Sequence, residues 1–438
     1  MNKTVGMISL GCAKNRYDSE SMLGVLSNAG WTIVNKPEDA HLLIINTCGF
    51  IENAKSESIS TILEYADMRE RTGMPEKILV TGCLSQRYPV ELYEEIPEVD
   101  GFLGVAQYDK LLETINDIEN ATRPQHYECQ HLFPEVKRVL TTPKWSSYIK
   151  ISDGCDNRCT FCAIPLIRGR YHSRPYGDIV TEAKSLAHDG VTEITLIAQD
   201  TSRYGTDMGG KTLLASLMRD IHDIEGIKWL RVLYCYPDTV NEELLDTIAD
   251  LPKACRYLDL PLQHINDYLL KRMNRRGDSE TIRNVIRMCK ERAISIRTTF
   301  IVGFPGETEE MFRELMDFVR ETRFDKLGAF AYSPEEGTAA AVMPDQIPEE
   351  IKQQRYDRLM RLQQGISRDN LHKRLGSVCE VLCEGRDKHV RYIGRSEFEA
   401  PEVDGLIHFT SEKPLNPGEY VNVRILAGKA YDLIGEAL

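Results

Sequence analysis

Three cysteines in the middle of the chain lie within one short stretch. Cys155, Cys159 and Cys162 follow directly on Gly154, with three and two residues between successive cysteines. Three thiolates on one loop can wrap a cubane iron–sulfur cluster, because thiolates are the usual ligands of such clusters. Three ligands leave one iron open, and an open iron can hold a small molecule and pass it an electron. The spacing therefore predicts a catalytic [4Fe-4S] cluster.

A structural zinc site is the alternative for the same thiols. Zinc would need a fourth ligand to close a tetrahedron, and His172 is a candidate nearby in the sequence. The spacing of the three cysteines fits zinc poorly, so the cluster is the favoured interpretation.

Three further cysteines, Cys12, Cys48 and Cys83, are far apart, but each comes directly after an apolar run typical of a strand. Their separations of 36 and 35 residues match one repeating strand and helix unit. Because parallel strands end at the same edge of a sheet, we expect the three thiols to meet in one crevice. This arrangement predicts a second three-thiolate [4Fe-4S] cluster. The helix after each cysteine should lower the pKa of its thiol through the positive end of the helix dipole.

The alternative is that these three are small buried core residues, a frequent role for cysteine. One such position would be ordinary, whereas three at matching strand ends favour the cluster. The other cysteines show no ligand spacing and are expected to be structural or incidental: Cys129, Cys235, Cys255, Cys289, Cys379 and Cys383.

The elements that must position these thiols follow from the alternation of apolar runs and amphipathic stretches. In the N-terminal part, strands are expected at 5–10, 41–46 and 77–80, and helices at 18–29 and 55–68. This alternation predicts a parallel sheet with helical crossovers, and therefore an α/β fold.

After a polar, proline-containing segment, the alternation resumes and predicts a partial TIM-type (β/α)6 barrel. Its six strands are expected at 148–151, 193–197, 229–234, 257–262, 295–302 and 326–331. A polar helix at 348–370 leads out of the barrel. Short strands broken by Gly, Pro and Asp then predict a small antiparallel β-barrel. These strands are expected at 378–383, 392–394, 406–408 and 420–425.

A chain of 438 residues is too long for one ordinary core. The changes of pattern predict four segments. These are an N-terminal domain at 1–118, a linker at 119–140, the barrel at 141–370 and a C-terminal domain at 371–438.

Composition restricts the compartment and the partners. No apolar run of 18 residues occurs, which excludes a membrane span, and the N-terminus has no charged leader, so a cytoplasmic location is expected. In a reducing compartment, the 12 cysteines are expected to serve metal or redox chemistry rather than disulfides. The net charge of −13, with acidic excess at both ends of the chain, favours a basic protein over nucleic acid as partner. Solubility alone is the other explanation of an acidic composition.

The run from Gly154 to Cys162, with Phe161 just before the last cysteine, resembles the pattern of the radical S-adenosylmethionine (SAM) superfamily. The resemblance implies that the cluster cleaves SAM into methionine and a 5′-deoxyadenosyl radical. It also makes the ends of later barrel strands candidates for SAM binding, together with Phe161. These candidates are Gln199 and Asp200, Gln263 and His264, and the turn from Gly303 to Gly306. That Gly-Phe-Pro-Gly turn permits close backbone approach, but it can equally be only a turn.

Over its whole length, the chain is similar to the methylthiotransferase family of radical SAM enzymes, which combine a three-cysteine domain, a SAM barrel and a TRAM domain. The runs 9–15, 46–51 and 154–159 resemble the branch that modifies an aspartate of small-subunit ribosomal protein twelve. The branch that modifies adenosine in transfer RNA more usually has Gln after the first cysteine and Ser after the second. The resemblance therefore implies insertion of a methylthio group at the β-carbon of that aspartate.

The resemblance also implies two [4Fe-4S] clusters with separate tasks. The radical formed at the central cluster would remove a hydrogen from the target β-carbon. The N-terminal cluster would present a sulfur atom, methylated beforehand by a second SAM, to the resulting carbon radical. A flavodoxin or ferredoxin is the expected reductant.

Two alternatives remain open. A transfer RNA methylthiotransferase would use the same cofactors, and a noncatalytic metal-binding protein would contact the ribosome through its terminal domain. That domain has a slight excess of acidic residues, which argues against RNA binding. Six basic residues in it can still line one face: Lys373, Arg374, Arg386, Lys388, Arg391 and Arg395.

Overall fold

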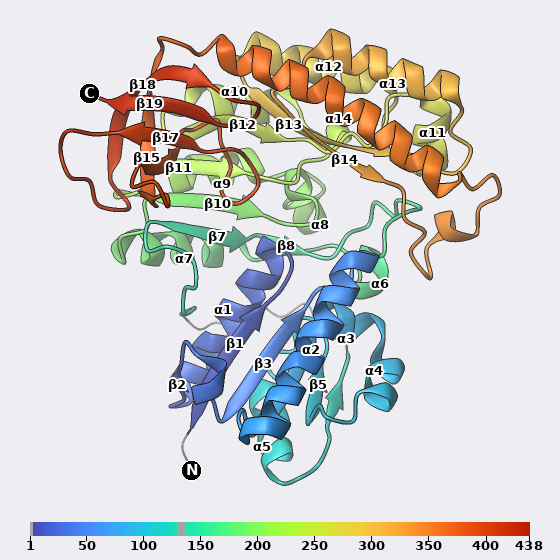
Figure 1. Cartoon of the computed structure of the whole chain (residues 1–438), viewed down its shortest axis with the longest axis vertical. Coiled ribbons are helices and arrows are strands. Elements are labelled where there is room, and N and C mark those ends of the chain that lie inside the picture. The colour runs from blue at the N-terminus through green and yellow to red at the C-terminus, as the bar shows by residue number, and fades with distance from the viewer. Residues whose placement is uncertain (1–2, 129–132, 134–136) are drawn as a thin grey trace.

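The computed structural model describes residues 3–128, 133 and 137–438 and has three parts (Figure 1). In Figure 1 the N-terminal sheet domain is at the bottom, a partial barrel lies above it, and a small closed barrel is at the upper left. The α/β class, the partial barrel and the terminal β-barrel expected from the sequence are confirmed.

The N-terminal domain is a sheet of six parallel strands in the order β2-β1-β3-β4-β5-β6. Helices α1 and α5 cover one face, and α2 and α4 cover the other, so the central strand β3 is fully buried. The strands are β1 Thr4–Ser9, β2 Thr32–Ile33, β3 Leu42–Thr47, β4 Lys77–Gly82, β5 Gly101–Leu103 and β6 Gln125–His126. The helices are α1 Ala13–Asn28, η1 Pro37–Asp39, α2 Glu52–Thr72, α3 Cys83–Arg87, α4 Pro89–Glu95 and α5 Leu111–Glu119. The sequence pattern predicted only β1, β3 and β4, because the other strands have two or three residues and therefore no detectable periodicity.

The central part is an open sheet of six parallel strands in the order β14-β13-β12-β11-β10-β7. Alternate residues of each strand face opposite sides. Ile194 and Leu196 of β10 pack among apolar residues of the surrounding helices, whereas Glu193 contacts Arg231 of β11 and Arg395 of the terminal barrel. The face of the sheet towards the terminal barrel therefore carries buried charges beside apolar side chains such as Ile197 and Trp229.

The bounds of this part follow the expected alternation. The strands are β7 Ser146–Lys150, β8 Ser152–Asp153, β9 His172–Ser173, β10 Glu193–Ile197, β11 Trp229–Val232, β12 Ala254–Asp259, β13 Ser295–Val302 and β14 Lys326–Ala331. The first helices are α6 Ile164–Ile167, α7 Tyr176–His188, η2 Thr201–Arg203, α8 Thr206–Gly209, α9 Leu214–His222, η3 Pro237–Thr239 and α10 Glu242–Asp250. The later ones are α11 Asp267–Arg272, α12 Ser279–Glu291, α13 Glu309–Thr322, η4 Ala339–Val342 and α14 Glu349–His372.

The C-terminal part is a closed barrel in the order β15-β16-β17-β19-β18. Its strands are β15 Val378–Arg386, β16 Tyr392–Arg395, β17 Ile407–Thr410, β18 Tyr420–Gly428 and β19 Leu433–Ala437. Strand β19 was not predicted, because it is short and has a glycine at its centre. It pairs in parallel with β17, while the other pairs are antiparallel, and this pairing closes the barrel without a free edge.

Buried polar contacts fix the terminal barrel to the central part. The Arg395 guanidinium lies 2.7 Å from the Glu193 carboxylate, and both side chains are almost completely buried. The Tyr257 hydroxyl of β12 donates to Asp404 over 2.7 Å. These contacts join the two parts into one body.

The linker expected at 119–140 lies partly outside the described residues. On its described flanks, β6 adds a strand to the N-terminal sheet, and Arg138 pairs with Glu182 of α7 over 2.6 Å. The exact domain boundaries stay predictions. Across residues 3–128, 133 and 137–438, no helix has the length and apolarity needed to cross a membrane.

Candidate functional site

The central cysteines lie on the loop between β8 and α6. Backbone hydrogen bonds hold this loop: the Cys155 N–H donates to the Gly169 carbonyl over 3.1 Å, and the Cys162 N–H donates to the Cys159 carbonyl over 3.0 Å. Burial raises the pKa of Cys155 to about 11, and it raises that of Cys162 as well. The bare thiols at these positions are therefore neutral at pH 7, and a bound metal is what would hold them as thiolates.

Two polar groups from later parts of the barrel surround Cys159. The Tyr236 hydroxyl lies 3.5 Å from the Cys159 sulfur, and Nη1 of Arg275 donates to the same sulfur over 3.9 Å. The Arg275 guanidinium also stacks over the Tyr236 ring, 3.7 Å from its centroid. Nothing in the sequence singled out these two residues, because they lie 77 and 116 positions from the cysteine.

Phe161 fixes the cysteine loop against the far side of the barrel. Its ring meets the Phe304 ring edge-on, with 6.5 Å between the centroids, and packs against a buried apolar cluster that includes Met273. The Thr160 N–H donates to the Met273 carbonyl over 3.0 Å. The aromatic residue thus orients the loop, while its contact with SAM stays a prediction.

The N-terminal cysteines come together at the carboxyl edge of the N-terminal sheet. Cys12 precedes α1, Cys48 follows β3 and Cys83 begins α3. The approach is close, because Gly11 has a φ of +88° and a Cβ there would lie 2.8 Å from Cys48 Cβ. Only glycine fits at that position. Cys12 is exposed, Cys48 is partly buried and Cys83 is buried, so the group opens outward on the Cys12 side.

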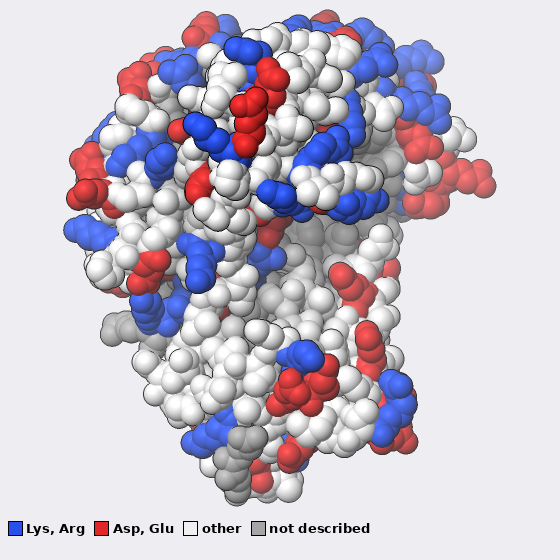
Figure 2. Space-filling view, turned by 60° about the vertical axis from the view of Figure 1, so that its left-hand side comes forward, with Lys and Arg blue, Asp and Glu red and all other residues white. Residues whose placement is uncertain are grey.

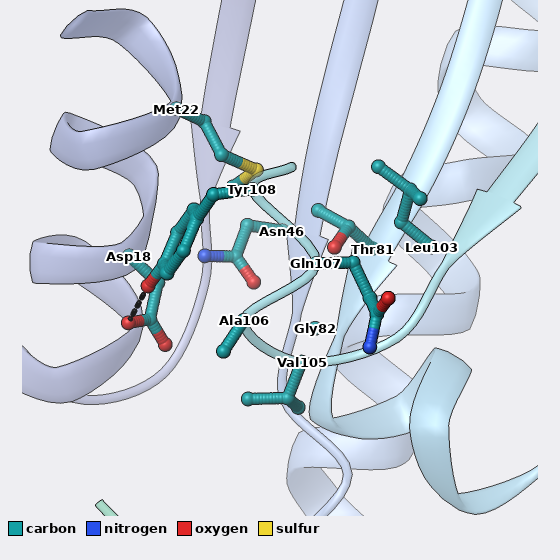
Figure 3. Close-up of a pocket in the computed structure, with 10 residues that line it drawn as sticks. All are labelled: Asp18, Met22, Asn46, Thr81, Gly82, Leu103, Val105, Ala106, Gln107 and Tyr108. Carbon is teal, nitrogen blue, oxygen red and sulfur yellow. Dashed lines mark hydrogen bonds between the residues drawn. The ribbon is translucent and has the colours of Figure 1, made fainter. Parts of the chain in front are cut away.

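A buried layer of mixed polar and apolar side chains lies beside the strand ends that lead to these cysteines (Figure 3). Asn46 and Thr81 in this layer belong to the strand ends that precede Cys48 and Cys83. The Tyr108 hydroxyl donates to the Asp18 carboxylate over 2.6 Å, as Figure 3 shows. The layer encloses a cavity of about 10 Å³, which is about the room one water molecule needs. The strand ends are therefore tightly packed, with polar and apolar side chains around a cavity that has room for one water molecule at most.

Arg168 contacts both halves of the site. Its Nη2 donates to Cys83 Sγ over 3.6 Å and to Asp18 over 3.0 Å, and its Nη1 donates to both carboxylate oxygens of Asp153 at 3.1 Å. Lys150 bonds Asp18 and Asp153 at 2.5 and 2.7 Å. All these side chains are buried. A network of opposite charges thus joins the N-terminal cysteines to Asp153, which stands two residues before the first central cysteine.

The expected lowering of thiol pKa values holds only at Cys12. Burial opposes ionisation there, but the nearby Lys14 and Arg168 cations hold the pKa of Cys12 below its ordinary value. The expectation is wrong for the other two, since burial raises the pKa of Cys48 and raises that of Cys83 to about 12. Helix α2 begins four residues after Cys48, and α3 is only five residues long, so neither dipole compensates for burial.

The donor atoms of both cysteine groups are too widely spaced for zinc. Among the described residues, three or more His, Cys, Asp or Glu ligand atoms all lie within 4.8 Å of one another only at Glu113, Asp117 and His126. Sulfurs around a tetrahedral zinc would be roughly 3.8 Å apart, given a Zn–S distance of about 2.3 Å. The other proposed zinc ligand, His172, lies on β9 with its Nδ1 4.0 Å from Asp207. An all-thiolate donor set is the usual ligand set of an iron–sulfur cluster.

Two predicted SAM-binding residues carry amide atoms without partners. Gln199 follows β10, and neither atom of its buried side-chain amide has a hydrogen-bond partner among the described residues; the same holds for Oε1 of Gln263. A buried unpaired amide costs stability, so these atoms fit a polar ligand such as SAM. Their neighbours are already bonded, because Asp200 accepts from Asn157 over 2.8 Å and His264 lies 3.2 Å from Glu307.

The two predicted glycines serve packing within the protein. Gly303 has a φ of +71°, and a Cβ there would lie 2.4 Å from Cγ of Lys352, which belongs to α14. At Gly306, a Cβ would lie 3.3 Å from the Arg272 guanidinium. The close approach at this turn therefore involves side chains of α14 and α11, and SAM binding by Gly303 and Gly306 stays a prediction.

Half of the six basic residues proposed for the terminal domain are ion-paired. Arg395 is buried against Glu193, Arg374 lies 2.6 Å from Glu399, and Arg391 lies 3.1 Å from Asp387. In Figure 2, Lys and Arg side chains are interspersed with Asp and Glu over the upper surface. A continuous basic face made of those six residues does not form.

Comparisons with known proteins follow the same division of the chain. Residues 149–319 match the Radical SAM superfamily, residues 375–438 match the TRAM domain, and residues 4–104 match a family described as Uncharacterized protein family UPF0004. The chain therefore contains a radical SAM domain, whose chemistry rests on an iron–sulfur cluster and SAM.

Solved structures share the fold. The radical SAM methyltransferase TsrM from Kitasatospora setae aligns with a TM-score of 0.60 at 17% identity, over 78% of this chain and 77% of that chain. The cobalamin-dependent SAM radical enzyme OxsB aligns with a TM-score of 0.51 at 15% identity, over 83% of this chain and 56% of that chain. At these identities the similarity concerns the fold alone.

Relatives of known name match over nearly the full length. The ribosomal protein uS12 methylthiotransferase RimO of Caldicellulosiruptor saccharolyticus is 48% identical, over 99% of this chain and 99% of the relative. RimO of Clostridium botulinum is 48% identical over 98% of this chain and 97% of the relative. RimO of Desulforamulus reducens is 47% identical over 99% of both. The chain therefore belongs to the RimO family of radical SAM methylthiotransferases.

Proposed function

We propose that this protein is a radical SAM enzyme that inserts a methylthio group at the β-carbon of an aspartate in ribosomal protein uS12. The observation that carries the proposal is the pairing of two cysteine groups through Arg168. This residue hydrogen-bonds Cys83 of one group and Asp153 beside the other. Two sites held together in this way suit two coupled tasks on one substrate carbon.

We assign one [4Fe-4S] cluster to each group of three cysteines. When bound, the central cluster with SAM supplies a 5′-deoxyadenosyl radical, and the N-terminal cluster supplies the sulfur. The chain contributes position: Phe161 orients the central loop, Gln199 and Gln263 offer amide groups to SAM, and Arg168 fixes Cys83. Closure of the two domains over the substrate excludes water from the radical.

Three of the six basic residues considered in the terminal domain are paired with carboxylates, which argues against a role in binding RNA phosphates and suits a basic protein substrate. We further propose a cytoplasmic location, where thiols stay reduced, and a flavodoxin or ferredoxin as the reductant. Substitution of one reductant for another in the assay below tests that last point.

The test is anaerobic reconstitution followed by incubation with SAM, a reductant, and either uS12 or transfer RNA. Mass spectrometry should show a methylthio group on an aspartate of uS12 and none on adenosine. Methylthiolated adenosine with unmodified uS12 would overturn the substrate. Absence of 5′-deoxyadenosine from the fully loaded protein would favour a noncatalytic role. A gel-shift series in rising salt adds an independent check, since genuine RNA binding weakens steeply with salt.

A further inference from the structure

Lys14 is a buried cation without a carboxylate to pair with. It is 8% exposed, and among the described residues no Asp or Glu oxygen lies within 4.0 Å of its Nζ. The contact recorded for Nζ is with the Tyr234 ring, 3.0 Å from the ring centroid. A cation over an aromatic face gains some attraction but keeps its need for hydrogen-bond acceptors.

The position of Lys14 on its helix makes the lack of a carboxylate partner more costly. It stands in the first turn of α1, directly after Cys12, and that turn contains no acidic residue. The first turn of a helix carries the positive end of the dipole, so it favours anions and disfavours cations. An anion brought to Lys14 would therefore interact with both the ammonium group and the helix end.

The two carboxylates that act electrostatically on Lys14, Asp259 and Asp153, are paired with other residues. Asp259 accepts from the Tyr234 N–H over 3.0 Å and from Arg297 over 2.8 Å. Asp153 is held by Lys150 and Arg168. Among the described residues no carboxylate pairs with Lys14, and its remaining anionic neighbour is the Cys12 thiolate.

Lys14 also lies where a substrate would have to be held. Cys12, its neighbour in sequence, is the exposed member of the N-terminal group. Tyr234 follows barrel strand β11, and its carbonyl accepts from the Thr201 N–H over 2.9 Å, close in the chain to Gln199. The ammonium group therefore lies between the N-terminal cysteines and the ends of the barrel strands. Figure 2 shows the surface hollowed between the N-terminal domain and the parts above it, with Lys and Arg along the upper rim.

We propose that Lys14 binds the carboxylate of the substrate aspartate and makes the site specific for an acidic side chain. The inference rests on the function proposed above. In aspartate, the β-carbon is bonded directly to the carboxylate carbon, so fixing the carboxylate fixes the carbon that reacts. Lys14 is thus a specificity residue that touches substrate.

The test compares binding of recombinant uS12 with a form whose target aspartate is changed to asparagine, measured by calorimetry on the reconstituted enzyme. The native enzyme should bind the aspartate form about 10- to 100-fold more tightly, as expected for a charge-assisted hydrogen bond. Lys14→Met should bind both forms equally, whereas Lys14→Arg should retain the preference. Lys36→Met, which removes an exposed charge elsewhere in the same domain, should behave like the native enzyme.

Thermal unfolding shows that each variant is folded, and its iron content shows that it carries its iron–sulfur clusters. If Lys14→Met still prefers the aspartate form as strongly as the native enzyme, the proposal is wrong. If that variant loses iron or changes the cluster's electron paramagnetic resonance signal while keeping the preference, Lys14 serves the cluster instead. If Lys14→Met cannot be loaded, loss of the preference in a folded Lys14→Arg enzyme refutes the proposal. Should the native enzyme leave uS12 unmodified, the function proposed above fails first, and this inference fails with it.

Discussion

The two cysteine groups are built in opposite ways. Cys155, Cys159 and Cys162 share one loop, ordered by backbone hydrogen bonds within and beside it. The N-terminal group takes one cysteine from each of three strand ends and depends on the sheet register and on Arg168, which follows the barrel's cysteine loop. A local site tolerates shifts between domains, whereas a dispersed site is only as accurate as the contacts between its elements. The following predictions test that difference, from the largest expected effect to the smallest.

Replacing each group of three cysteines by alanine should separate their roles completely. Without the central group, formation of 5′-deoxyadenosine from SAM should fall to background. Without the N-terminal group, SAM cleavage should persist while sulfur insertion stops. Each variant should retain roughly half of the iron of the native protein, if each group holds one cluster. Product analysis by liquid chromatography and an iron assay provide the measurements, and methylthiolated uS12 from the second variant would refute its role as sulfur donor.

Arg168→Met should affect the dispersed group most. It leaves Asp18 and Asp153 with one cation fewer in a buried network, which is expected to cost about 3–5 kcal/mol of unfolding free energy. Chemical denaturation measures the loss, and iron titration should show a weakened N-terminal cluster with the central one retained.

Arg170→Met is the matched control. Arg170 lies two positions after Arg168 and also pairs with an aspartate, Asp156, but its side chain is 78% exposed. Its denaturation midpoint should not move. If the two substitutions lowered stability and iron binding equally, the buried network around Arg168 would have no special role in holding the N-terminal cysteine group.

The junction with the terminal barrel offers a pH test of a second buried ionic contact. Burial opposes ionisation of Glu193, but Arg395 and Arg231 lower its pKa to about 2. Because this folded-state pKa is below the ordinary value of 4.5, the ionised group stabilises the fold above about pH 4.5, and the stability is lost as the pH falls toward 2. The loss should be on the order of 3 kcal/mol.

Urea denaturation between pH 6 and pH 2 checks this prediction. Glu193→Gln should be less stable than the native protein at pH 6, since two buried guanidinium groups lose their partner, and its stability should change less with pH. If the stability of Glu193→Gln depended on pH as that of the native protein does, other carboxylates would be responsible for the acid sensitivity.

Gln199→Leu should have the smallest effect of these substitutions. The effect should be limited to SAM binding at the central cysteine group. SAM binding should weaken about 5- to 30-fold through loss of hydrogen bonds, while the SAM-free protein should not be destabilised, because the native amide has no partner there. Calorimetric titration with SAM measures the first effect.

Gln363→Leu is the control for a buried glutamine whose amide nitrogen is bonded, although its Oε1 has no partner among the described residues. Gln363 donates to the Phe324 carbonyl over 3.0 Å, so its replacement should lower stability without affecting SAM binding. Unchanged SAM affinity in Gln199→Leu would remove that residue from the cofactor site.

The expectations from sequence succeeded where the signal was local or periodic. The strand at Ser295–Val302 and the loop carrying the central cysteines follow from patterns within a few residues. Short strands such as Gly101–Leu103 gave no such signal, because three residues cannot reveal a period and their pairing comes from neighbouring strands. Thiol pKa values failed for a related reason, since burial depends on what packs around a residue.

By itself, the sequence determined the α/β class, the succession of the longer strands and helices, and the spacing of the two sets of cysteines, because periodicity and spacing are written along the chain. Only the tertiary structure decided that Arg168 contacts Cys83, that Tyr236 and Arg275 surround Cys159, and that Lys14 lies buried over Tyr234. A lysine or arginine in a sequence is by default a solvated surface charge. Whether it becomes a buried partner depends on long-range packing, which brings residues from distant elements into the same small volume.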